Sequence, residues 1–171
     1  MTLLRRYASR LLFATVVAAG LLCSGTALAQ KAPEDPGKPS ADEAARVIDF
    51  FYHGQGKGVV LAKARVCSDV PTTGENRFEC VGLVATDALV RGTTYNLHMM
   101  YLVPEGDRVD DIQVDYVFGG EAIKTDTVGV EGSLRYRTWT AFTPRESGNG
   151  AIRISQGGEV LNEISVTVQD A

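Results

Sequence analysis

The chain has 171 residues, with 17 Lys and Arg against 21 Asp and Glu, and it contains three Cys and two His. Its formal net charge of −4 at pH 7 argues against nucleic acid and anionic membrane surfaces as partners, because both attract basic proteins.

The first 29 residues have the three parts of a secretory signal peptide. Arg5, Arg6 and Arg10 precede an uncharged, mostly apolar run of twelve residues, and Ala-Leu-Ala at 27–29 is a small-x-small cleavage motif. The run is too short to remain in a bilayer as a spanning helix, so we expect no stable membrane span. Cleavage after Ala29 of this bacterial, Sec-type signal predicts a periplasmic or extracellular protein.

Cleavage changes both the charge and the cysteine count. It removes three Arg and no acid, so 14 basic and 21 acidic side chains remain and the net charge becomes −7. It also removes Cys23, which we expect to carry no lipid, because Leu22 is too large for the position before a lipoprotein cysteine. Two cysteines in an oxidising compartment favour a disulfide.

A linker and a short helix are expected next. Residues 30–40, QKAPEDPGKPS, hold three prolines and four charges and predict a disordered linker. Ser40 followed by Glu43 is a capping-box pattern that begins a helix. Apolar residues then recur at helical spacing: Ala44, Val47, Ile48 and Phe51. The pattern favours a helix over residues 41–52, although an extended strand from Val47 onward also suits these β-branched and aromatic residues.

The rest of the chain reads as about eight short strands separated by Gly, Pro and Asp. The expected strands are residues 59–67, 77–85, 93–103, 111–118, 121–130, 134–142, 149–155 and 159–168. Gly119-Gly120 and Gly157-Gly158 are glycine pairs typical of tight hairpin turns. The fold class is therefore all-β, a single immunoglobulin-like antiparallel β-sandwich that, with the N-terminal helical or extended segment, occupies residues 41–171.

Alternation along the strands predicts which side chains fill the core. On the last strand Val160, Ile164, Val166 and Val168 share one face. Met99 is expected to point into the core, and its neighbours His98 and Met100 to the opposite face. The expected core residues are Tyr95, Leu97, Tyr101, Ile112, Val114, Tyr116, Trp139, Ile152, Ile154, Val166 and Val168.

The stretch CSDVPTTGENRFEC joins Cys67 to Cys80. A thioredoxin-type redox site requires Cys-x-x-Cys at the start of a helix, but twelve residues separate these cysteines and both flanks resemble strands. A zinc site requires four ligands at short spacing, which the chain lacks. We therefore predict a structural disulfide, worth roughly 3 kcal/mol through its restriction of the unfolded chain.

Other candidate chemistry is weaker. Histidine and methionine are soft-metal ligands, so His98 and Met100 offer an alternative function in extracytoplasmic copper binding, although a complete site would need ligands from other strands. The neighbouring acids Asp110, Asp111 and Asp115 read as a solvated loop and strand entrance, because they lack the spacing of a calcium loop. A second alternative is a hydrolase whose acids converge only in the fold. No cofactor is expected.

The strand LRYRTWTAF places Arg135, Arg137 and Trp139 on one face, which is a candidate binding surface with the indole as a stacking platform. The competing interpretation places this Trp in the core and pairs the arginines with an acid at the sheet edge.

The Arg-Thr-Trp triplet at 137–139, the AIRI strand and the final Gly-Gly hairpin resemble the DUF2914-like group of extracytoplasmic β-sandwich domains. The resemblance extends loosely over residues 59–168, and the group's second Trp is replaced here by Ala151 or Ile152. It implies a sandwich fold and no particular activity. We therefore expect a secreted or periplasmic, non-catalytic module that binds a protein or a cell-envelope component.

Overall fold

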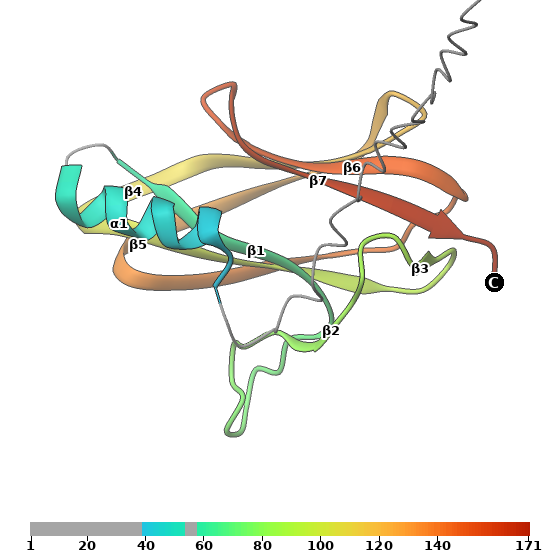
Figure 1. Ribbon diagram of the computed structural model, residues 1–171, viewed down its shortest axis with the longest axis horizontal. Helices are drawn as coiled ribbons and strands as arrows, with labels where there is room; N and C mark the ends of the chain where they lie inside the picture. Colours follow the sequence, from blue (N-terminus) through green and yellow to red (C-terminus); the bar gives the residue numbers. More distant parts are fainter. Residues whose placement is uncertain (1–38, 54–57) are drawn as a thin grey trace, which may run out of the picture. The chain divides into compact units, whose positions relative to one another are not determined.

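The computed structural model describes residues 39–53 and 58–171 (Figure 1). The predicted signal peptide and residues 30–38 of the predicted linker lie outside these described residues. Within them, helix α1 (Ala41–His53) is followed by seven strands: β1 (Val60–Asp69), β2 (Val81–Leu83), β3 (Leu89–Val90), β4 (Tyr95–Phe118), β5 (Glu121–Phe142), β6 (Gly148–Gln156) and β7 (Glu159–Gln169). None of the described helical residues form a segment long and apolar enough to cross a membrane.

A long hairpin of β4 and β5 links the two layers of the sandwich (Figure 1). The first part of β4 pairs with β1, and its last part, from Ile112 onward, pairs with β6. Strand β5 follows β4 along both parts. One layer is therefore β2-β1-β4-β5 and the other is β5-β4-β6-β7-β3, which confirms the predicted immunoglobulin-like β-sandwich.

The continuous hairpin differs from the expected short strands. The expected strands 93–103 and 111–118 are parts of β4, and 121–130 and 134–142 are parts of β5. The expected acidic loop lies within β4: Arg108 is opposite Glu131 and Asp115 opposite Thr125, and a register shift spans Asp110 and Asp111. Register shifts let the hairpin bend without ending, and at the bend a Cβ on Gly132 would lie 2.9 Å from the backbone nitrogen of Gly106. The glycine and proline residues that suggest strand ends in the sequence therefore lie at a bend within continuous strands.

The expected strand over residues 77–85 is mostly a turn. Only Val81–Leu83 is strand, because the preceding residues belong to the loop that the disulfide closes. A short strand that the sequence did not indicate, β3, instead pairs in parallel with β7 through Leu89 and Val168.

Both glycine-pair turns are confirmed. Gly119 and Gly120 have φ values of 60° and 88° and join β4 to β5, and Gly157 and Gly158 have φ values of 56° and 86° and join β6 to β7. A turn that needs positive φ at both central residues strongly favours glycine, which is why these pairs predict hairpins.

The core lies between the two layers, and every expected core residue except Trp139 is buried. The Tyr116 hydroxyl lies 2.5 Å from the Thr140 hydroxyl and joins one layer to the other inside this core. Val160 is 51% exposed, contrary to expectation, because the register of β6 and β7 shifts after Ile154 and Leu161 packs against the core in its place.

Helix α1 forms as predicted and begins with the expected capping box. The Ser40 backbone N–H donates to Glu43 Oε2 at 2.8 Å, and the Glu43 N–H donates to Ser40 Oγ at 3.2 Å. The buried face matches the predicted one only in part, because Val47 packs against the sheet but Phe50 takes the place expected for Phe51. Phe50 is 1% exposed and packs on Ala62 and Leu102, whereas Phe51 is 52% exposed. Ile48, also expected to pack, is exposed as well.

Candidate functional site

A groove of about 740 Å³ lies on the outer face of the β1-β4-β5 layer. One wall is helix α1, which contributes Val47 and Phe51. The opposite wall is the end of the disulfide-closed loop together with β2, which contributes Leu83. Of the side chains singled out from the sequence, the groove brings together His98, Met100 and Arg135.

The floor of the groove follows from strand pairing. Arg65 of β1 lies opposite His98 of β4, and Lys63 lies opposite Met100. Because alternate residues of a strand point to the same face, His98 and Met100 both line the groove and Met99 between them is fully buried in the core. This is the arrangement that the sequence predicted for the His-Met-Met triplet.

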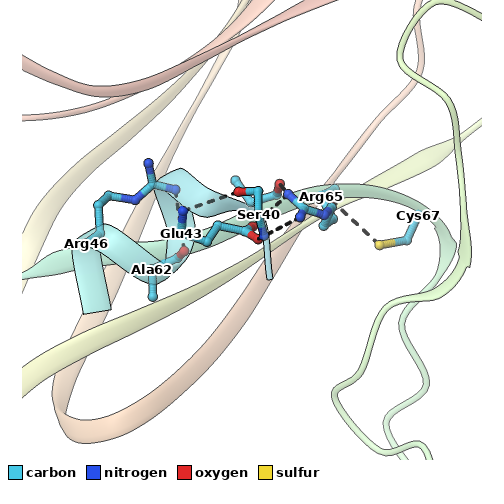
Figure 2. Close-up of polar contacts among 7 residues, drawn as sticks. Ser40, Glu43, Arg46, Ala62, Arg65 and Cys67 are labelled. Atoms are coloured by element: carbon cyan, nitrogen blue, oxygen red, sulfur yellow. Dashed lines mark hydrogen bonds and ion pairs between the residues drawn. The ribbon is translucent and has the colours of Figure 1, made fainter. Parts of the chain in front are cut away.

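An ion pair holds the helical wall against the floor (Figure 2). Arg65 Nη1 lies 2.7 Å from Glu43 Oε1, and Arg65 Nη2 donates to Glu43 Oε2 at 2.8 Å. The Glu43 side chain is 4% exposed, so the pair is shielded from water on the acid's side. Next to it, Arg46 Nη2 donates to the carbonyl oxygen of Ala62 at 3.4 Å. The Glu43 carboxylate thus both caps the helix, through Ser40, and orients it on β1, through Arg65.

The second wall is held by the predicted disulfide. Cys67 of β1 and Cys80 are bonded, with a Cα–Cα distance of 5.6 Å. Glu79, just before the second cysteine, forms ion pairs with Arg135, at 2.8 Å, and with Arg137. The predicted pairing of these arginines with an acid is present, and the acid comes from this loop.

Trp139 lies on the outer face and not in the core. It pairs with His98 in the β4–β5 register, and its indole stacks on Phe78 of the disulfide loop with ring centroids 5.5 Å apart. The sequence correctly placed Arg135, Arg137 and Trp139 on one face, but the loop covers the indole and Arg135 is the member of the three that lines the groove.

His98 is the most unusual polar group of the floor. It is 3% exposed, and its Nε2–H donates to the carbonyl oxygen of Phe78 at 3.1 Å. Its Nδ1 has no hydrogen-bond partner within the described part of the chain. Burial is the main cause that lowers the pKa of His98, and the contact with Phe78 offsets part of that shift. The neutral imidazole is therefore favoured, with an acceptor nitrogen left unpaired.

The acids give little support to metal or hydrolytic chemistry. Asp110, at the bend of the hairpin, pairs with Arg108 at 2.8 Å, which lowers its pKa, and Asp115 accepts a hydrogen bond from Thr125. Glu79 is the one acidic side chain that lines the groove among the described residues. Over residues 39–53 and 58–171 no three His, Cys, Asp or Glu side chains form a cluster that could hold a metal ion.

Charge and apolar surface coexist in the groove. Three cations line it, of which Arg65 pairs with Glu43 and Arg135 pairs with Glu79. Lys63, the third, has no ion-pair partner in the described structure. Three apolar side chains at the walls remain exposed: Phe51 at 52%, Leu83 at 39% and Leu134 at 59%. The sequence analysis did not single these out as one site, because isolated apolar residues on three separate segments carry no local signal.

Comparisons with known proteins add little to this description. No protein-family model matches the sequence, and no curated protein matches it. Among solved structures, an immunoglobulin-like protein from Pseudomonas aeruginosa is 17% identical over 65% of this chain and 96% of that chain, with a TM-score of 0.42. The CARDB domain of a Pyrococcus furiosus protein, in complex with di-metal ions, is 17% identical over 66% of this chain and 90% of that chain, with a TM-score of 0.38.

A third similar structure is the alkylpurine DNA glycosylase of Pseudomonas fluorescens bound to DNA, which is 13% identical over 74% of this chain and 35% of that chain, with a TM-score of 0.42. Similarities this low carry no argument about ligand or activity. Over residues 39–53 and 58–171 the chain is an immunoglobulin-like β-sandwich with one short helix and one disulfide.

Proposed function

We propose that this protein is an extracytoplasmic, non-catalytic binding module whose groove between α1 and the disulfide loop receives a protein or cell-envelope component. The observation that carries the proposal is the concentration of exposed apolar side chains, Phe51, Leu83 and Leu134, around one hollow of about 740 Å³. Exposed apolar surface that surrounds a concave site is typical of ligand and partner binding.

Three features support the extracytoplasmic part of the proposal. The N-terminal sequence has the pattern of a secretory signal, the Cys67–Cys80 disulfide suits an oxidising compartment, and the chain resembles DUF2914-like domains in its last strands. The disulfide also closes the loop that builds one wall of the groove, so the oxidising compartment would be a condition for an intact binding site.

A site-specific cross-linking experiment tests the function. A photoreactive residue placed at Leu134 in the groove wall should form covalent adducts with components of a cell-envelope extract. The matched control is the same residue at Val160, which is 51% exposed but does not line the groove. Adducts specific to position 134 are the expected result. Equal labelling at both positions, or none at 134, would contradict the proposal.

A further inference from the structure

The groove combines two properties that suit an amphiphile. Its walls present Val47, Phe51 and Leu83, which remove an alkyl chain from water. Its floor presents polar groups, among them Lys63 and His98. Its volume of about 740 Å³ lies within the range of about 300–1,000 Å³ that is usual for small-molecule sites, so a ligand smaller than a folded partner is sufficient to fill it.

The charged side chains that line the groove indicate which charge the polar head of a bound amphiphile would carry. Cations outnumber acids among the lining side chains, although the whole chain has a net charge of −4. Arg65 and Arg135 have carboxylate partners, whereas Lys63 has none within the described residues. An ammonium in a partly buried hollow is stabilised by an opposite charge. One negative charge on the ligand neutralises the one unpaired ammonium.

We infer that the groove binds a single-chain amphiphile with a carboxylate head, with the alkyl chain against the α1 and β2 walls and the carboxylate at Lys63. The inference rests on the proposed function, because it names the envelope component that the groove receives. A monoanionic carboxylate suits the single unpaired ammonium better than a phosphate monoester, which carries about −1.5 to −2 charges.

Backbone amide NMR shifts on the purified protein test the inference with three probes below their micelle concentrations: dodecanoate, dodecyl phosphate and dodecyltrimethylammonium. We expect dodecanoate to shift the amides of the groove and to bind more tightly than dodecyl phosphate, and dodecyltrimethylammonium to bind weakest. Lys63→Gln should weaken dodecanoate binding on the order of tenfold, the loss of one charge-assisted contact. The matched control, Lys124→Gln, removes a lysine that does not line the groove and should leave binding unchanged.

A second readout separates a bound carboxylate from simple apolar contact. A negative charge close to the imidazole stabilises its protonated form, so saturating dodecanoate should raise the pKa of His98, whereas dodecyltrimethylammonium should not. Leu83→Gln should weaken every probe, because it removes apolar wall without changing the charge of the floor.

The outcomes distinguish this inference from the proposed function. Equal binding of the three probes in the groove would overturn the carboxylate inference and leave a binding groove in place. Preference for dodecyl phosphate would also overturn it. If no probe shifts the groove amides but the Leu134 cross-link succeeds, the inference fails and the partner is a protein or another envelope component. Failure of both experiments would overturn the proposed function as well.

Discussion

The ring of Phe78 stacks on the indole of Trp139, with centroids 5.5 Å apart and 29° between the ring planes. Phe78 belongs to the disulfide loop and has a φ of 61°, the one non-glycine residue with positive φ in the described structure. Its N–H donates to the carbonyl of Pro71 at 2.7 Å, and its own carbonyl accepts from His98. These contacts offset a backbone conformation that costs a non-glycine residue roughly 1–2 kcal/mol.

Substitutions at Phe78 should separate the backbone strain from the ring contact. Phe78→Ala keeps the strain and loses the stacking, whereas Phe78→Gly loses both. We therefore expect Phe78→Ala to lower the free energy of unfolding by about 1 kcal/mol more than Phe78→Gly does. Urea unfolding followed by circular dichroism measures the difference. An alanine variant as stable as the glycine variant would contradict the left-handed conformation at this position.

The disulfide should stabilise the fold and also keep Trp139 covered. The Cys67→Ser/Cys80→Ser variant is expected to unfold with a free energy about 3 kcal/mol lower, since its unfolded chain is no longer restricted. Trp139 is the only tryptophan, so its emission should shift to longer wavelength when the native protein is reduced, before the strands unfold. An indole in the core would show no such early shift. Intact mass should show two hydrogens fewer in the oxidised chain, and free thiols in the native protein would refute the bond.

The ion pair between Glu43 and Arg65 should decide whether α1 stays on the sheet. Glu43→Gln can still form a capping box, but it removes the carboxylate charge next to the Arg65 guanidinium. We expect a loss of about 2 kcal/mol, the size of a charge-assisted hydrogen-bonded pair, and faster hydrogen exchange in residues 41–53. Ser40→Ala is the matched control. It removes the cap, at about 1 kcal/mol, and leaves the ion pair in place, so equal exchange in both variants would argue against an anchoring role.

Local rules account for the parts of the fold that the sequence predicted. The hairpin turns at residues 119–120 and 157–158 need positive φ, which the glycine pairs alone predict. The burial of Met99 follows from the alternation of side chains along one strand. Alternation separates two faces but does not say what covers the outer one. Trp139 was therefore placed in the core, because the ring that covers it, Phe78, lies about sixty positions earlier in the chain.

The groove could not be predicted from the sequence either, because contacts between distant segments form it. Helical spacing was compatible with a buried Phe50 or a buried Phe51, and the choice depends on the contact of Glu43 with Arg65, 22 residues away. The long β4–β5 hairpin likewise stays paired through bulges that look like loop residues in the sequence. A few residues of the site, such as His98 and Arg135, could be singled out from the sequence, but their gathering around one hollow depends on contacts between separate segments.

The buried, neutral state of His98 predicts how stability depends on pH. Burial lowers its pKa in the folded protein below the ordinary value of 6.5, to which the imidazole returns in the unfolded chain. As the pH falls through 6.5 toward the folded pKa, the unfolded state therefore binds more protons than the folded state. The free energy of unfolding drops in this window. Above it, the contribution of the neutral His98 to stability is fully present. His98→Gln cannot titrate and should show a smaller drop between about pH 7.5 and 5.5. Urea unfolding of the wild type and His98→Gln across this range measures the difference. Parallel curves for the wild type and His98→Gln would show that this imidazole does not resist protonation in the fold.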